Sequence, residues 1–434
     1  MKPQRQREHR GGTEKFRSGH DSAFAALRHR DFRLLWLGQI VSVTGSQMQL
    51  VAINWHVYLL TKSALALGLV GLFRGLPVIL CSLAGGVVAD AVDRKRLMIG
   101  TQTVMLVCAG LLTATTLAGI QSVWPIYLLS AFASAATAFD IPARQSLMPT
   151  LVPLEDFPNA VSLGIVVFNV ATISGPAIAG VLLAQSGPAL IYGINAFSFV
   201  AVIGALLAMR ASGSPELQTD RKDALSLAAL KEGLTFVWRT PIMVQTMTLD
   251  FVATFFASAT LLLPIFARER LHVGPHGYGL LAAAPAIGSV ITAYVMARLG
   301  TFQREGRIVV WAVAVFGVAT AAFGVSTAFW LSLLMLAVTG AADTVSTVLR
   351  QTIRQLVTPN HLRGRMTSIN MMFFMGGPQL GELEAGLVAA LIGAPLSVVV
   401  GGLGSTVAAA IAAVKSKSLM EFQISDLRSE ITLH

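Results

Sequence analysis

The sequence predicts an all-α membrane protein whose twelve transmembrane helices form two pseudo-symmetric six-helix bundles. Three observations support this fold class: a ladder of long apolar segments, a concentration of Lys and Arg on one side of it, and a repeat between its halves. Hydrophobic residues make up 54% of the 434 residues and charged residues 12%. Because soluble domains average about 25% charged residues, most of this chain's surface requires lipid as its solvent.

Each apolar segment is long enough to cross the hydrocarbon core of a bilayer, which takes roughly 20 residues of helix. Short polar stretches separate the segments, so the connecting loops fall on alternating sides of the membrane. In order along the chain, the expected segments are 33–60, 66–90, 96–120, 124–145, 159–185, 189–210, 242–266, 276–299, 306–327, 329–354, 364–390 and 394–414.

Basic residues are distributed very unequally between the two sets of loops. The set that includes both termini holds 28 of the 32 Lys and Arg residues. The other side has only Lys62, Arg268 and Arg270, and Arg74 lies inside a segment. Since cytoplasmic loops are enriched in Lys and Arg, both termini are expected in the cytoplasm. The net charge of +10 follows from this bias and favours membrane lipid over nucleic acid as a partner, because no basic patch alternates with aromatic residues.

The apolar ladder pauses once, near its middle. Ser212-Gly213-Ser214-Pro215 ends the sixth segment, and the leucines from Leu225 to Leu234 are interleaved with charges, as in an amphipathic helix on a membrane surface. We therefore expect five regions: a disordered basic cytoplasmic arm (1–30), an N-terminal six-helix bundle (31–210), a cytoplasmic linker with an amphipathic helix (211–240), a C-terminal six-helix bundle (241–414) and a cytoplasmic tail (415–434).

The two halves are related in sequence. Arg144-Gln145 recurs as Arg350-Gln351, an offset of 206 positions. The same offset carries Pro153 to Pro359, Ser162 to Ser368, Gly175 to Gly381, Gly180 to Gly386 and Gly187 to Gly393. Each half is therefore expected to be a structural copy of the other. Two such copies suit alternating access, because they can rock about a site between them.

The loop between the second and third segments carries Gly86, Asp90, Arg94 and Lys95. The glycine permits close helix contact, the aspartate accepts hydrogen bonds at a helix end, and the basic pair holds the loop in the cytoplasm. This spacing resembles the signature loop of the major facilitator superfamily, Gly-x-x-x-Asp-x-x-x-Arg-Lys, although Asp93 stands where many members have Gly. The resemblance implies a gating latch; a charge cluster that only sets topology is the alternative.

The fifth segment carries Gly175, Pro176 and Gly180. Small residues let neighbouring backbones approach, and a proline inside a helix kinks it. This pattern resembles the antiporter motif of drug-exporting members, which ends Gly-Pro-x-x-Gly-Gly, with Ala179 in place of one glycine. The resemblance implies export in exchange for protons. Close packing with no bearing on direction is the alternative.

A narrower resemblance covers nearly the whole chain. The runs Arg30 to Trp36 and Gly381 to Gly386, with Arg144-Gln145 before Pro149 and Asn195-Ala196, are similar to one bacterial branch of that superfamily. The branch includes enterobactin exporters and macrolide-efflux-like proteins. It implies a multi-pass protein of the bacterial inner or plasma membrane and a small amphiphilic cargo, such as a siderophore or a drug. Import, or lysophospholipid flipping by the same fold, is left open.

Three carboxylates lie where charge is unfavourable. Asp250, Glu382 and Glu384 fall within apolar segments, and a charge at mid-membrane costs at least about 2.5–3.5 kcal/mol. We predict proton coupling for these three residues, with helix packing as the alternative. Two positions apart on a helix, the two glutamates diverge by about 200°, so they cannot both face one cavity.

Four further polar residues within the segments are candidates for substrate contact or for helix packing. They are Arg74, Asn54, Gln47 and Asp343. Interhelical hydrogen bonds would account for them as well as cargo would.

Other classes of function have less support in the sequence. The eight His residues are scattered, and the Gly-rich stretches lack the Lys-Ser/Thr ending of a nucleotide-binding loop. We therefore expect no catalytic residues, metal or cofactor, and a monomer that exchanges a small molecule for protons. A transporter-derived receptor or scaffold is the alternative of another class.

Overall fold

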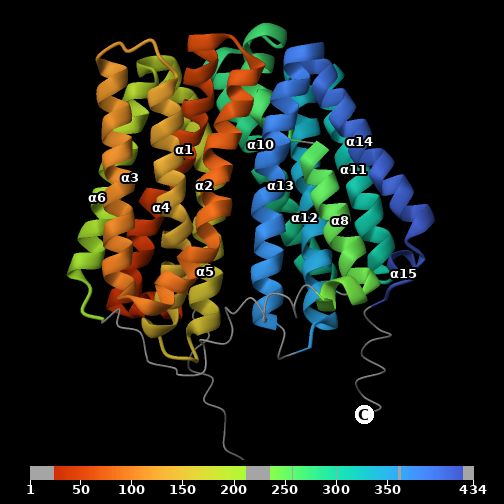
Figure 1. Cartoon of the computed structure of the whole chain (residues 1–434), viewed down its shortest axis with the longest axis horizontal. Helices are drawn as coiled ribbons and strands as arrows, with labels where there is room; N and C mark the ends of the chain where they lie inside the picture. Colours follow the sequence, from red (N-terminus) through yellow and green to blue (C-terminus); the bar gives the residue numbers. More distant parts are fainter. Residues whose placement is uncertain (1–23, 212–234, 257, 301, 360–362, 424–434) are drawn as a thin grey trace, which may run out of the picture.

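The chain folds into two helical bundles that stand side by side (Figure 1). The computed structural model describes residues 24–211, 235–256, 258–300, 302–359 and 363–423. The expected amphipathic helix at 225–239 lies mostly outside these residues; 235–239 are helical.

Six long helices form the N-terminal bundle. They are α1 (Arg30–Thr61), α2 (Ala64–Ala91), α3 (Arg94–Leu117), α4 (Trp124–Leu147), α5 (Phe157–Ser186) and α6 (Pro188–Ala208). Local signals set several ends: the Ser63 side chain accepts from the amide of Ala66 at the start of α2, and Asp93 accepts from Arg96 at the start of α3. Such side-chain caps satisfy amides that have no partner within the helix.

The C-terminal bundle repeats this arrangement with one interrupted helix. Its first span is α8 (Pro241–Phe256), continued by η4 (Ala259–Leu262), α9 (Leu263–Ile265) and the π-helical η5 (Phe266–Arg270). The other helices are α10 (Gly274–Leu299), α11 (Glu305–Val325), α12 (Phe329–Val357), α13 (Arg363–Ile392), α14 (Ala394–Lys415) and the short α15 (Lys417–Met420).

Each expected segment corresponds to one long helix or, for the seventh, to α8 with its continuation. In the described part of the chain, ten helical spans are long and apolar enough to cross a membrane. The remaining two, α1 and α13, are also long, with 32 and 30 residues. Glutamines such as Gln39 and Gln47 lower the apolar character of α1. The prediction of an all-α membrane protein is confirmed.

The repeat is visible in where the helices begin. An offset of 211 positions carries the first residue of α1, Arg30, onto that of α8, Pro241, and the first residue of α3 onto that of α11. The offset of 206 positions does the same for α5 with α13 and for α6 with α14. The halves therefore correspond helix by helix, with α2 equivalent to α10 and α4 to α12.

The two bundles contact each other chiefly through two helix pairs, α2 with α13 and α5 with α10. These pairs are equivalent under the repeat. Glycines make both crossings close: a Cβ at Gly386 would lie 2.6 Å from Cα of Gly68, and a Cβ at Gly279 would lie 2.7 Å from Cα of Gly180. Since the offsets also carry Gly68 onto Gly279 and Gly180 onto Gly386, one contact occurs twice.

All these contacts lie at one end of the molecule, the end opposite the labelled α15 in Figure 1. One hydrophobic cluster spans both bundles there; its buried members include Trp55, Leu67, Phe266, Tyr278 and Ala385. At the other end each bundle has a core of its own. That of the N-terminal bundle includes Phe32, Met98, Leu147 and Leu206, and that of the C-terminal bundle includes Val309, Ile353 and Ala409. We call the first end the closed end.

Candidate functional site

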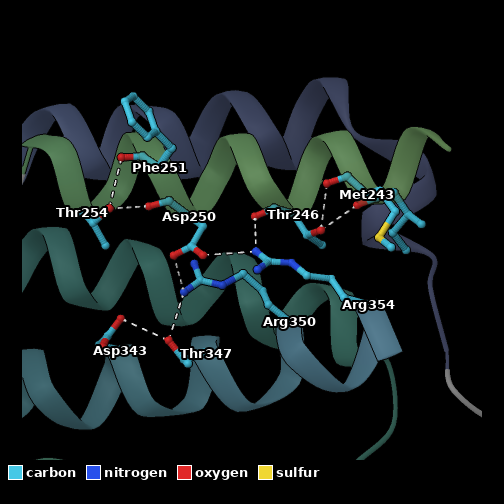
Figure 2. Close-up of polar contacts among 10 residues, drawn as sticks. Met243, Thr246, Asp250, Phe251, Thr254, Asp343, Thr347, Arg350 and Arg354 are labelled. Atoms are coloured by element: carbon cyan, nitrogen blue, oxygen red, sulfur yellow. Dashed lines mark hydrogen bonds and ion pairs between the residues drawn. The ribbon is translucent and has the colours of Figure 1, made fainter. Parts of the chain in front are cut away.

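A buried cluster of charges joins α8 to α12 (Figure 2). Asp343, Thr347, Arg350 and Arg354 follow one another at spacings of four, three and four residues. These spacings place them on one face of α12. Asp250 of α8 lies opposite that face.

Asp250 is paired with two guanidinium groups. Its Oδ1 lies 2.8 Å from Nη2 of Arg350, and its Oδ2 lies 3.1 Å from Nη2 of Arg354. The same Arg354 nitrogen donates to the carbonyl of Thr246 at 3.1 Å. The side chains are 12%, 3% and 8% exposed for Asp250, Arg350 and Arg354. Because α8 otherwise packs mainly on α13 and α14, these ion pairs are the principal link between α8 and α12.

Asp343 belongs to the same cluster but touches no arginine directly among the described contacts. Arg350 donates to the hydroxyl of Thr347 at 3.1 Å, and that hydroxyl donates to Oδ1 of Asp343 at 3.4 Å. Two carboxylates are thus connected through one guanidinium and one hydroxyl. These two contacts lie within α12, so they link Asp343 to the cluster without joining it to another helix.

The N-terminal bundle has a counterpart of this cluster in which a neutral side chain replaces the aspartate. Arg144 of α4, which corresponds to Arg350, donates to the side-chain oxygen of Gln39 in α1. Gln39 corresponds to Asp250 through the offset of 211 positions. The repeat therefore preserves an arginine bridge between equivalent helices, but only the C-terminal half places a carboxylate in it.

The two glutamates of α13 have different surroundings, as their spacing predicts. Glu382 faces α2, where a Cβ at Gly71 would lie 2.6 Å from its Oε2. That oxygen is inaccessible to solvent and accepts no hydrogen bond in the described structure. Arg74 of α2 is the charged group that acts on it electrostatically. Glu384 is only partly buried and does not share this contact.

Asn54 and Gln47 of α1 both lie at helix contacts. Asn54 is buried one turn after Val51, whose carbonyl accepts a hydrogen bond at 3.2 Å from the hydroxyl of Tyr278, in the other bundle. A Cβ at Gly175 would lie 2.6 Å from Cβ of Gln47, so this glycine makes room for α1 against α5. Both polar residues therefore take part in packing in this state of the protein.

Gly180 of the antiporter-like motif lies directly at a crossing between the bundles. A Cβ at Gly180 would lie 2.9 Å from Cα of Gly279, and a Cβ at Gly279 would lie 2.5 Å from the carbonyl oxygen of Pro176. The motif thus supplies the α5 surface against which α10 rests.

The basic part of the signature loop ties helices together within the N-terminal bundle. Arg94 donates to the carbonyl of Ser146 at 3.3 Å, and Lys95 donates to that of Met209 at 2.7 Å. Gly86 and Asp90 lie in the last turns of α2, but their side-chain positions fall outside the described residues.

Aromatic and charged residues fill the space between the two bundles at the closed end. The hydroxyl of Tyr58 donates to the carboxylate of Glu269 in η5, and the rings of Trp55 and Tyr278 stack with centroids 5.3 Å apart. Lys62, just beyond α1, lies 4.9 Å from the centroid of the Tyr58 ring. Desolvation lowers the pKa of Lys62, the nearby Arg268 lowers it further, and Glu269 opposes both effects.

Sequence reasoning missed several of these groups. The sequence pattern gives Arg350 a place in the repeat and treats it and Arg354 as basic residues that set topology, and it predicts no role for Glu269. The four-three-four spacing from Asp343 to Arg354 was the signal that could have identified the polar face of α12.

Among the described residues, no group of three or more His, Cys, Asp or Glu side chains could hold a metal ion.

Sequence comparison places this architecture among known exporters. The family profile described as transmembrane secretion effector matches residues 21–434. The multidrug efflux pump Tap of Mycolicibacterium fortuitum is 26% identical over 365 residues, which cover 82% of this chain and 88% of the pump. The enterobactin exporter EntS of Citrobacter koseri is 24% identical over 376 residues, which cover 87% of this chain and 89% of the exporter.

Solved structures share the fold at lower identity. A POT family transporter in complex with a thioalcohol-conjugated peptide superposes with a TM-score of 0.71 and 11% identity, covering 90% of this chain and 96% of that one. A bacterial homologue of the iron transporter ferroportin, in an inward-facing state, gives a TM-score of 0.66 and 17% identity, with coverage of 88% and 97%.

Proposed function

This chain belongs to the transmembrane secretion effector family, and from that premise we propose that it exports a small amphiphilic molecule in exchange for protons. The resemblance to major facilitator exporters that the motifs predicted is confirmed. The chain is accordingly a multi-pass membrane transporter. Proton exchange, the individual site residues and the orientation are the proposed parts.

The closed end is the structural feature that supports alternating access. One hydrophobic cluster joins both bundles there, whereas each bundle has a separate core at the other end. A rocking motion that separates the glycine crossings would open the closed end and bring the other ends together. The proposed division into bundles at 31–210 and 241–414 is compatible with such a motion, since the long helices of each half exceed these limits by at most one residue.

The distribution of charge supports an orientation. Lys62, Arg268 and Arg270 are the basic residues of the loops on the closed side, and both termini lie with the far larger basic set. We therefore place the closed end outside and both termini in the cytoplasm. In this orientation the protein is ready to accept its cargo from the cytoplasm.

The carboxylates differ in how well they suit proton transfer. Asp250 neutralises part of the charge of two buried guanidiniums, so a proton on Asp250 would leave both of them uncompensated. We therefore propose that Asp250, with Arg350 and Arg354, holds α8 against α12. Proton coupling fits the glutamates of α13 better, because the described contacts include no ion pair of either one.

The cargo class rests on the relatives. Tap is named a multidrug efflux pump and EntS an enterobactin exporter. Drugs and siderophores share an amphiphilic character, and we propose a cargo of this class.

Everted membrane vesicles from cells that overproduce the protein test this proposal. Acidifying the vesicle interior should drive accumulation of a fluorescent amphiphilic dye above the level of vector-only vesicles, and a protonophore should abolish it. A panel of dyes, drugs and siderophores tested as competitors would then define the cargo. If no dye or competitor moves, or if movement ignores the protonophore, proton-driven export by this chain is ruled out. Dye movement only out of the everted vesicles would identify an importer.

A further inference from the structure

One carboxylate is enclosed in the glycine crossing between α2 and α13. Three glycines of α2, at spacings of three and four residues, face α13. Because the two helices run in opposite directions, each later glycine of α2 lies against a residue one turn earlier on α13. The facing pairs are Gly68 with Gly386, Gly71 with Glu382, and Gly75 with Gln379. Because these three positions of α2 have no side chain, the side chain of Glu382 fits between the two helices.

In the part of the chain that the structure describes, no hydrogen-bond donor reaches Oε2 of Glu382. Its Oε2 lies against Gly71 and is inaccessible to solvent, with no hydrogen bond among the described contacts. The side-chain oxygen of Gln379, on the same face of α13, is also buried and unbonded. Two buried acceptors with no donor are unfavourable, and more so when one of them carries a charge. A proton on Glu382 would supply the donor and remove the charge.

The charges around Glu382 do not compensate it in this state. Arg74 of α2 is near enough to act on it electrostatically, but no ion pair within 4.0 Å joins the two among the described contacts. On α8, the titratable residue Asp250 forms ion pairs with Arg350 and Arg354. The turn η4 contains no titratable side chain, and in α14 only Lys415 is charged, at the end far from the crossing.

Burial therefore outweighs the attraction to Arg74. Bringing a carboxylate out of water is strongly unfavourable unless a partner is held in good geometry, and Arg74 is not in contact. Once the crossing separates, water reaches both groups and the ionised form becomes favourable again. The protonation of Glu382 and the closure of this end are thus linked.

We propose that Glu382 carries the coupling proton and that the outer end closes only when this proton is bound. The inference rests on the proposed proton-driven export and on the orientation given above. With the outer end open, water outside transfers a proton to the carboxylate, which becomes a neutral carboxylic acid. Closure buries that acid against Gly71. Release of the same proton towards the cytoplasm restores the carboxylate and favours reopening.

Pulsed electron spin resonance distances across the outer end test this inference without any cargo. Spin labels go on Gln121→Cys and Thr327→Cys, in exposed turns that join α3 to α4 and α11 to α12. The native Cys81 and Cys108 are first replaced by serine. In the full-length protein in lipid nanodiscs, we expect short distances at acidic pH and a second, longer distance at alkaline pH.

Variants assign this pH response to one residue. Glu382→Gln, which mimics the protonated acid, should give the short distance at every pH. Glu382→Asp, which keeps a titratable group, should retain the response and so controls for a folding defect. The matched control is Glu155→Gln, an exposed glutamate in the turn between α4 and α5 that has no part in the proposed coupling, which should behave like the wild type.

Two results would overturn the inference: distances that do not change with pH in the wild type, or an unaltered pH response in Glu382→Gln. Neither result bears on whether dye moves in vesicles, so failure of this inference is distinguishable from failure of proton-driven export. Conversely, a pH response that depends on Glu382 would stand even if vesicles moved none of the dyes tested.

Discussion

Arg350 and Asp250 form a buried ion pair, 2.8 Å long, between α12 and α8. The equivalent helices of the other half, α4 and α1, are bridged by Arg144 and the neutral Gln39. An arginine bridge thus belongs to both halves, but the partner of the arginine is a carboxylate only in the C-terminal half.

Asp250→Asn should markedly destabilise the protein. Removing one partner of a buried ion pair leaves its charge uncompensated and typically costs about 3–5 kcal/mol, and here two guanidiniums lose their partner. Thermal unfolding of the purified protein in detergent measures the effect as a lower midpoint. Asp343→Asn is the matched control, because its contact passes through the Thr347 hydroxyl at 3.4 Å. Equal midpoints for the two variants would contradict this account of the cluster.

Gly386→Ala should prevent closure of the outer end. The added methyl group would lie 2.6 Å from Cα of Gly68, a distance that only movement of the backbone can relieve. We expect dye transport in vesicles to fall at least about tenfold, which corresponds to about 1.4 kcal/mol against the closed state.

Gly204→Ala provides the control for that variant. Gly204 lies in α6, and a Cβ there would meet no atom within 4 Å, so transport should remain at the wild-type level. Wild-type transport by Gly386→Ala would show that the crossing is not needed for the cycle.

Tyr58→Phe should weaken closure of the outer end without abolishing transport. The substitution removes a hydrogen bond to the Glu269 carboxylate, and bonds to charged groups contribute about 1.5–3 kcal/mol. The distance between spin labels at positions 121 and 327 should therefore shift towards the open value at a given pH. Tyr294→Phe, which alters only a contact with Arg298 in the same helix, should leave the distances unchanged. A matching shift in both variants would argue against a specific latch.

The helices could be predicted from the sequence because each carries its own signal. The apolar composition of each segment indicates by itself that the segment lies in lipid. The repeat that relates Arg144 to Arg350 also relates the first residues of whole helices. The interrupted seventh span is the exception. Its first helix ends at Phe256, and a π-helical turn completes it at Arg270. A run of apolar residues does not distinguish these geometries.

The contacts at the site could not be predicted in the same way, because they depend on which helices become neighbours. The offset related Gly180 to Gly386, but nothing in it showed that each faces a glycine of the opposite bundle. The arginines at 350 and 354 carry the same charge pattern as residues that set topology, and only the fold reveals their partner in α8. The divergence of Glu382 from Glu384, by contrast, follows from helix geometry alone.

Simultaneous measurement of cargo and proton flux in proteoliposomes tests the central claim most directly. The purified protein is reconstituted with a pH-sensitive dye inside, and a cargo identified in vesicles is added on one side without an imposed gradient. Exchange predicts that cargo entry drives protons out, so the interior becomes alkaline, and that Glu382→Gln abolishes this signal. Cargo entry at the wild-type rate with no change in internal pH would contradict proton exchange.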